Sequence, residues 1–194
     1  MLTAVDHDSG GDYWLWLTRP HNPSRCKLAS DDPSAGIQIL NTLFTALRAQ
    51  PHRQLRIKPH PNDYDWIYQQ LISRNKLGDR VMIDRRPLQI VLPQASVVIT
   101  EDTTAGMDAM FFRKPMVHVR FSDTAPVLPF VEYGAALPAF DSNELLASVA
   151  MVDSRGPNNR CQAMSRFLLD HAGPCDGGAA QRLTELILDV ANQP

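Results

Sequence analysis

Short runs of β-branched and aromatic residues alternate with longer stretches of helical periodicity along most of this chain. The first run is YWLWL at residues 13–17, and residues 34–49 then carry an apolar helical stripe at Ile37, Leu40, Leu43, Phe44 and Leu47. This alternation is typical of parallel βαβ units, because each helix returns the chain to the edge where a new parallel strand starts. It predicts a Rossmann-like, doubly wound α/β sheet with helices on both faces.

The same pattern extends over the rest of the chain. Strands are expected at 13–17, 54–58, 81–84, 97–100 and 116–119, and a loop broken by prolines follows the first of them at 18–27. Helices are expected at 34–49, 63–74, 87–95, 103–112, 143–152, 159–169 and 178–191. We therefore expect a single domain over 1–194, with a core at 13–140, C-terminal helices at 141–192 and about five or six parallel strands.

Charge and composition exclude several classes of function. The 194 residues carry 19 basic and 21 acidic side chains, which gives no electrostatic reason to expect binding to nucleic acid or to anionic membranes. The apolar runs are too short to span a bilayer, and the N-terminus is polar rather than a secretory signal. Three widely spaced cysteines without a CxxC pattern favour neither a disulfide framework nor a zinc site, and they suit a cytoplasmic protein.

A KPHP sequence follows the second predicted strand. Parallel sheets bind ligands outside the carboxyl ends of their strands, so this turn is a candidate site. Prolines on both sides of His60 stiffen the turn and end the strand. The His60 imidazole can donate to a phosphate oxygen, and Lys58 adds positive charge beside it. The alternative is a surface loop that contains a histidine and a lysine without a ligand.

A second cluster, TEDTTAGMDAM, leads from the fourth predicted strand into a helix. Thr103 or Thr104 is placed to cap that helix, whose first N–H groups and positive dipole end suit an anion. Asp108 lies four residues after Thr104, on the same face of the helix. A plain capping motif is the alternative, because threonine is common at this position.

Other polar residues at the expected ligand edge give weaker signals. Glu101 and Asp102 are adjacent, so their side chains point in different directions and shared acid–base chemistry is not expected. Asp84 and Arg85 follow the third strand and are candidates to contact a ligand. The chain has no P-loop, no GxGxxG and no placed carboxylate pair for a metal, so no metal is expected and the catalytic residues are unknown.

These motifs together resemble a known family, the CDP-glycerol glycerophosphotransferases and related capsule polysaccharide enzymes. The segment VVITEDTTAGMDAMFFRKPMVH at 97–118 is similar to the family's ITDYSS sequence, its acidic helix and its KP-hydrophobic strand. Lys58, His60 and Pro61 match the family's KxHP motif, and residues 176–182 are similar to its DGxAxxR closing helix. Thr103–Thr104 replaces the usual serine pair, and Asp102 stands where an aromatic residue is common.

The resemblance implies a nucleotide-sugar-binding, Rossmann-like half of a GT-B transferase. It implies that Lys58, His60, Thr103 and Thr104 hold the donor phosphates, with Asp84, Arg85, Glu101 and Asp108 as further candidate contacts. The donor would be a CDP- or UDP-linked sugar or polyol, attacked by direct displacement without a cofactor. His60, Thr103 and Thr104 should then lie on one concave surface at the carboxyl edge of the sheet.

GT-B enzymes also have an N-terminal acceptor domain, for which this chain has no room. We therefore expect a missing domain or a partner chain, no turnover by the isolated chain, and peripheral contact with the inner membrane face only through the missing portion. The apolar stripes of the last two helices should be partly exposed. Two alternatives stay open: a non-catalytic module that binds a nucleotide sugar or acts as a scaffold, and half of a nucleotide-sugar 2-epimerase.

Overall fold

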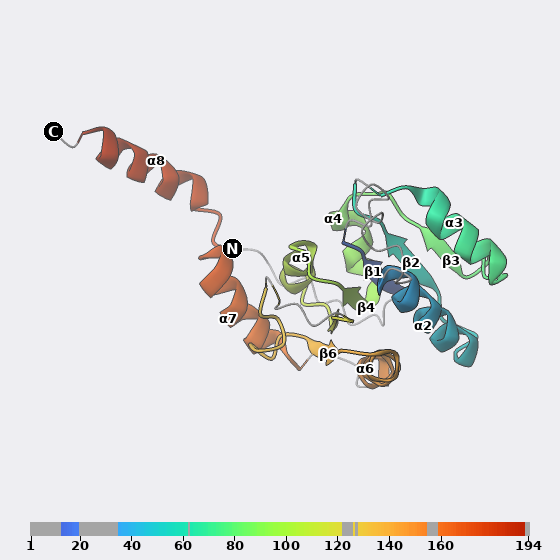
Figure 1. The fold of residues 1–194 in the computed structure, drawn as a ribbon. Coiled ribbons are helices and arrows are strands. Elements are labelled where there is room, and N and C mark those ends of the chain that lie inside the picture. Colours follow the sequence, from blue (N-terminus) through green and yellow to red (C-terminus); the bar gives the residue numbers. More distant parts are fainter. Residues whose placement is uncertain are drawn as a thin grey trace.

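The computed structural model describes residues 13–19, 35–61, 63–121, 126, 128–154 and 159–192. These residues form one six-stranded sheet in the order β3-β2-β1-β4-β5-β6, in which every neighbouring pair is parallel (Figure 1). The strands are β1 (Tyr13–Leu17), β2 (Leu55–Lys58), β3 (Val81–Ile83), β4 (Ala95–Thr100), β5 (Met116–Val119) and β6 (Leu137–Ala139). The predicted doubly wound parallel sheet is confirmed.

Helices cover both faces of this sheet. They are α2 (Ala35–Ala49), α3 (Asp65–Arg74), α4 (Leu88–Val91) with a 3-10 turn at Leu92–Gln94, α5 (Ala105–Phe111), α6 (Ser142–Ser154), α7 (Cys161–Ala172) and α8 (Ala179–Ala191). From β1 the chain builds β2 and β3 on one side, and then β4 to β6 on the other. The direction of winding therefore reverses between β1 and β4, which is where such sheets bind ligands.

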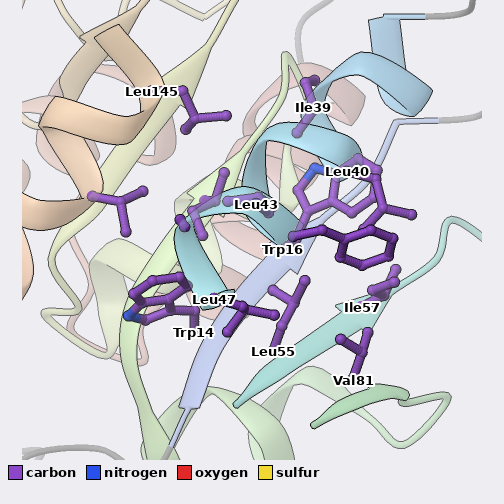
Figure 2. Close-up of a cluster of buried hydrophobic side chains, with 14 of the residues drawn as sticks. Trp14, Trp16, Ile39, Leu40, Leu43, Leu47, Leu55, Ile57, Val81 and Leu145 are labelled. Carbon is purple, nitrogen blue, oxygen red and sulfur yellow. The ribbon is translucent and has the colours of Figure 1, made fainter. Parts of the chain in front are cut away.

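The first of two apolar cores lies between the sheet and the helices α2, α3 and α6. Trp14 and Trp16 of β1 point into it and are fully buried against the apolar stripe of α2 (Figure 2). The stripe follows the predicted helical spacing, with Leu40, Leu43 and Leu47 buried. Alternate residues of one strand thus supply one face of the sheet.

The second core lies on the opposite face, under α4, α5 and α7. It receives the other residues of β1, Tyr13, Leu15 and Leu17, so every residue of that strand is buried. Phe130 and Phe167 pack together at its centre, with their rings tilted by 46° and their centroids 5.1 Å apart. Burial on both faces explains why β1 is an uninterrupted apolar run rather than an alternating one.

The sequence prediction omitted one strand. β6 has only three residues, with Pro138 in the middle, and proline usually argues against a strand because it lacks an N–H. β6 is tolerated here because it lies at the edge of the sheet, paired with β5 alone. The start of the predicted helix at Ser34 and most of the predicted loop at 18–27 lie outside the described residues.

The last two helices differ in burial. α7 buries Met164, Phe167 and Leu168 in the second core. α8 stands away from the body of the protein and buries no residue (Figure 1). Its large apolar side chains Leu183, Leu186, Ile187, Leu188 and Val190 are 55–62% exposed. The prediction that part of the C-terminal apolar surface is exposed is therefore confirmed. Among the described helices, none is long and apolar enough to cross a membrane.

Candidate functional site

The carboxyl ends of β2 and β4 lie on either side of β1. In the sheet register, Leu17 at the end of β1 is opposite Lys58 of β2 on one side and Thr100 of β4 on the other. The KPHP turn and the Thr103–Thr104 turn begin just beyond these two positions. Both turns therefore emerge at the same edge of the sheet, as predicted. That their side chains hold a donor stays a prediction.

Buried hydrogen bonds fix the turn that carries His60. The hydroxyl of Thr18 accepts a bond from the backbone N–H of His60 at 3.0 Å and donates to the Asp63 carboxylate at 3.1 Å. The hydroxyl of Tyr68 donates to the same carboxylate oxygen at 2.9 Å. Thr18, Asp63 and Tyr68 are all buried, and burial raises the pKa of Tyr68 well above its ordinary range. The backbone of His60 is thus attached to the end of β1.

Arg85 attaches the loop after β3 to the same turn. Its guanidinium donates to the carbonyl oxygens of His60 at 3.0 Å and of Asp63 at 2.7 Å, and to the carboxylate of Asp65 at 2.9 Å. These bonds engage the guanidinium within the protein. The geometry gives Arg85 a role in holding the turn, and its expected contact with a donor stays a prediction.

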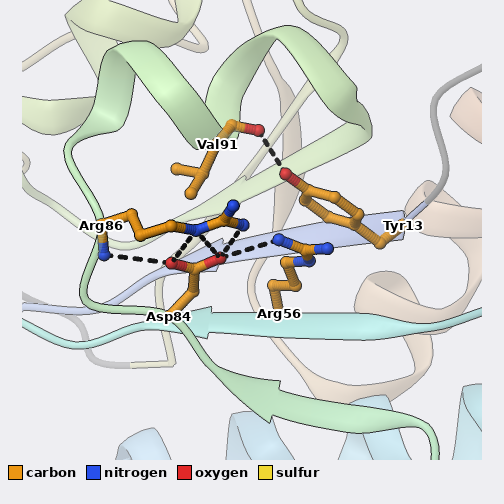
Figure 3. A network of polar contacts seen from close by, with 5 residues as sticks. All are labelled: Tyr13, Arg56, Asp84, Arg86 and Val91. Carbon is orange, nitrogen blue, oxygen red and sulfur yellow. Dashed lines mark hydrogen bonds and ion pairs between the residues drawn. The ribbon is translucent and has the colours of Figure 1, made fainter.

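Asp84 is the centre of a network of charges and aromatic contacts (Figure 3). Its buried carboxylate accepts bonds from Arg56 at 2.8 Å and from the Arg86 guanidinium at 2.6 Å. Arg56 in turn lies over the ring of Tyr13, 4.0 Å from its centroid. The hydrogen bonds from Arg86 are the largest cause that lowers the pKa of Asp84, and the bond from Arg56 adds to them. Together they lower this pKa to about 2, although burial acts in the opposite direction. The carboxylate is therefore already satisfied inside the protein, and its predicted contact with a donor is untested.

Lys58 differs from these residues because its charge is not matched. Its side chain is half-buried, and among the described residues its ammonium group makes no hydrogen bond or ion pair. Burial lowers the pKa of Lys58, and the nearby positive charge of Arg85 lowers it further, while Asp84 acts in the opposite direction. Arg85 is already paired with Asp65, and Asp84 with Arg56 and Arg86, so the ammonium of Lys58 is the group here that is left to favour an anion.

The turn before α5 departs in detail from the prediction. Thr104 is exposed and already has helical backbone angles, φ −60° and ψ −22°, so its hydroxyl makes no capping bond. An N-cap side chain needs an extended backbone to reach the free N–H groups, which explains the difference. The Thr103 hydroxyl accepts a long bond of 3.4 Å from the N–H of Ala105. Asp108, half-buried on α5, has its pKa raised by burial.

A small hollow opens where β1, β4 and β5 end beside the start of α2. Its polar lining consists of Arg19, Glu101, Asp102 and Arg120, over apolar side chains that include Ile39. Glu101 is buried and pairs with Arg19 at 3.6 Å. Glu101 was expected at this edge, whereas Arg19 and Arg120 were not among the predicted site residues. Their places within two residues of the ends of β1 and β5 were the available signal, since every strand end at this edge is a candidate position.

His60, Thr103 and Thr104 do not line this hollow. All three residues lie at the same edge of the sheet as the hollow. The hollow is therefore not the concave surface on which the three were expected to meet. The part of the chain that the structure describes holds no group of three or more histidine, cysteine, aspartate or glutamate side chains placed to bind a metal.

The sequence of the chain matches a known protein family. The family model described as capsule polysaccharide biosynthesis protein matches residues 2–119, more than half of the chain. The chain belongs to this capsule polysaccharide biosynthesis family. The match includes β1 to β5 and therefore both candidate turns. No curated protein sequence matches the chain significantly.

Solved structures share the fold of this capsule-family chain. The C-terminal domain of LpcC, a glycosyl transferase group 1 family protein from Francisella tularensis, is 13% identical with a TM-score of 0.55, and the match covers 86% of this chain and 89% of that domain. The wall teichoic acid polymerase TagF, soaked with CDPG, is also 13% identical with a TM-score of 0.56, and the match covers 93% of this chain and 42% of TagF.

A third similar structure is the UDP-GlcNAc 2-epimerase of Methanocaldococcus jannaschii, in complex with UDP-GlcNAc and UDP. It is 15% identical with a TM-score of 0.51, and the match covers 84% of this chain and 46% of the epimerase. The capsule-family chain thus spans less than half the length of TagF and of this epimerase. At such low identities the likeness establishes the fold, which is the expected Rossmann-like fold of a GT-B donor domain.

Proposed function

We propose that this domain binds the nucleotide-activated donor of a glycosyl or polyol-phosphate transferase in surface polysaccharide biosynthesis. The observation that carries the proposal is the half-buried, unmatched ammonium of Lys58, at the end of β2 beside the reversal of the sheet. A partly buried cation without a hydrogen-bonded or ion-paired counter-ion among the described residues favours an anionic ligand. The phosphates of a CDP- or UDP-linked donor supply that charge.

The residues around Lys58 suit a phosphate in this position. The His60 backbone is fixed through Thr18 and Arg85, so its imidazole is presented on a rigid turn. Thr103 and Thr104 follow the end of β4, which lies at the same edge of the sheet on the other side of β1. A site assembled in advance loses little conformational entropy when the ligand binds.

In the proposed reaction an acceptor hydroxyl displaces the nucleotide directly, without a covalent enzyme intermediate or a metal. Lys58 and His60 stabilise the negative charge that develops on the departing phosphate. The acceptor and the base that takes its proton are assigned to a further domain or partner chain. This division agrees with the fact that the chain spans under half the length of TagF, whose structure was soaked with CDPG.

Two other functions are compatible with the same fold. The similarity to a UDP-GlcNAc 2-epimerase in complex with UDP favours a nucleotide-sugar 2-epimerase half as the second candidate. A binding or scaffolding module without chemistry is the third. Incubation of the full protein with CDP- and UDP-linked donors separates the three, because a transferase consumes donor with acceptor, an epimerase interconverts sugars without one, and a module does neither.

The binding site is tested by calorimetric titration of CDP, UDP and CMP. Replacing His60 or Thr104 by alanine should weaken binding by about 1.5–3 kcal/mol for each charge-assisted bond lost, and Lys58→Met should do the same. His52→Ala is a matched control, since His52 is exposed in the turn before β2, at the opposite edge of the sheet. Thr45→Ala on the exposed side of α2 is the control for Thr104. Equal affinities for all variants would refute the assignment.

A further inference from the structure

His118 in β5 is a buried histidine whose ring is not hydrogen-bonded. It is 1% exposed, and neither of its ring nitrogens has a hydrogen-bond partner within the described part of the chain. A neutral imidazole has one N–H donor and one acceptor nitrogen, and buried groups of this kind nearly always find partners. An apolar residue would fill the same space without this cost, so the position of His118 needs an explanation.

The surroundings of His118 connect it to the turn before α5. In the sheet it is opposite Thr100, the last residue of β4, and on the other side opposite Pro138 of β6. Its ring meets the Phe130 ring edge-on, with centroids 5.2 Å apart. The same Phe130 ring packs so closely on the first turn of α5 that a Cβ added at Gly106 would lie 2.9 Å from it. His118 therefore lies next to the segment that runs from Thr100 into α5, with the Phe130 ring in contact with both.

Three charged groups act on the His118 ring. Asp102, in the turn between β4 and α5, favours the protonated imidazole, and so does Glu132 in the segment that leads to β6. Arg120, just beyond the end of β5, opposes protonation. The other elements packed here contribute uncharged groups: Pro138 from β6 and the aromatic rings of Phe130 and Phe167. Burial is the largest influence and lowers the pKa of His118.

Asp102 is the group through which a charge on His118 would act on the turn. Its carboxylate accepts a hydrogen bond of 3.3 Å from the N–H of Leu128, and it directly precedes Thr103. An imidazolium at position 118 attracts this carboxylate and competes with Leu128 for it. Any movement of Asp102 is transmitted to Thr103 through the peptide bond that they share.

We propose that His118 is a positioning residue, whose neutral form keeps the Asp102–Thr104 turn in its donor-binding conformation and whose protonated form draws Asp102 away. This inference rests on the proposed function for the role of Thr103 and Thr104. The coupling makes donor binding weaker at acidic pH. The ring itself does not contact the donor, because Phe130 and the strand ends bury it.

Hydrogen–deuterium exchange of the unliganded full chain tests the coupling without any assumption about the ligand. After correction for intrinsic exchange rates, the amides of residues 103–112 should lose protection in the wild type as the pH falls from 7.5 through the titration of His118, which burial moves below the ordinary histidine pKa. They should not do so in His118→Phe or His118→Gln, which cannot be protonated. In the wild type, the midpoint of this loss should coincide with the titration of the His118 ring signal in NMR spectra, a comparison that needs no variant. Protection that is independent of pH, or that changes equally in the variants, overturns the inference.

Calorimetry with CDP at pH 7.5 and at a pH below the observed titration of His118 then tests the link to binding. The wild type should lose at least about fivefold more affinity at low pH than His118→Phe or His118→Gln, the lower limit of a typical coupling between two sites. The effects of pH on CDP itself and on the rest of the site are common to all three proteins and cancel in this comparison. A wild-type protein with pH-dependent exchange that binds no nucleotide would refute the proposed function and leave the coupling intact. Nucleotide binding with an identical pH dependence in all three proteins would refute the coupling alone.

Discussion

Replacing Asp84 by asparagine tests whether the carboxylate between Arg56 and Arg86 stabilises this fold. The carboxylate is 3% exposed and accepts bonds from both guanidinium groups and from the backbone N–H of Arg86 at 3.0 Å. Asparagine keeps the size of the side chain but removes its charge. The two arginines then lose their shared counter-ion, and Arg56 is left mostly buried beside the ring of Tyr13.

The expected magnitude follows from the pKa of Asp84. These contacts lower that pKa from 3.8 to about 2. A tenfold change in proton affinity corresponds to about 1.4 kcal/mol, so the ionised carboxylate stabilises the folded state by about 2.5 kcal/mol at neutral pH. Since half of the Arg86 side chain is exposed and its contribution is screened, we expect about 1.5–2.5 kcal/mol.

The sign of the pH dependence is fixed by the direction of the shift. A carboxyl group with a lowered pKa in the folded state stabilises the protein fully above its unfolded pKa, and the stabilisation is lost as the pH falls through the folded value. For Asp84 the loss begins near pH 4 and continues to about pH 2, with about half of it gone at pH 3. The difference between the wild type and Asp84→Asn should therefore shrink over this range.

Urea denaturation at pH 7, 5, 4 and 3, followed by far-UV circular dichroism, measures this difference. Asp79→Asn is the matched control, because Asp79 is exposed and lies just before β3 as Asp84 lies just after it. The control should change the free energy of unfolding by less than about 0.5 kcal/mol. If Asp84→Asn is as stable as the control at pH 7, or if its deficit is unchanged at pH 3, the network does not stabilise the fold in the way argued.

Three further predictions concern packing and the ends of the structure. Gly106→Ala should lower the free energy of unfolding by about 1–3 kcal/mol in thermal or urea denaturation, because the added Cβ would lie 2.9 Å from the buried ring of Phe130. This loss is expected although alanine has the higher helix propensity. Gly78→Ala is the neutral control, since Gly78 has open space around it. Asp63→Ala should cost about 1–3 kcal/mol for each buried hydroxyl left unpaired, and CDP titration should show weaker binding; unchanged affinity would separate the turn from the site. Deleting residues 179–192 should leave the urea-unfolding free energy within about 0.5 kcal/mol, since α8 buries no residue, and a larger loss would show an undetected contact.

The fold could be predicted from the sequence because the strands and helices alternate in a repeated pattern. YWLWL became β1, and 116–119 became β5 with the predicted bounds. β6 could not be found, because three residues around a proline carry no strand signal and their pairing depends on the position of β5. The exposure of α8 was expected only through the family resemblance, since its apolar spacing is equally typical of a buried helix.

The candidate site was predicted less completely, and for a physical reason. Lys58 and His60 can be recognised from the sequence alone, because the prolines on both sides of His60 end the strand and stiffen the turn that follows it. Thr18 and Asp63 carry no such mark, and their role in fixing His60 depends on which strands are neighbours. Arg85 likewise looks like a ligand contact in the sequence, and only the folded chain shows that its donors are engaged by the turn.

Polar side chains at the carboxyl edge of this sheet fall into two groups that call for different experiments. Asp63, Asp84 and Arg85 have their hydrogen bonds satisfied by the protein, so substituting them is expected to change stability first and binding only through the geometry of the turns. The ammonium of Lys58 and the ring of His118 have no such partners among the described residues. The buried ring nitrogens of His118 cost free energy that the fold does not recover, whereas the partly buried ammonium of Lys58 is left available to an anion. Proteins retain costs of this kind mainly at functional sites. Loss of function without loss of stability is therefore the expected result at Lys58, and a changed pH dependence is the expected result at His118.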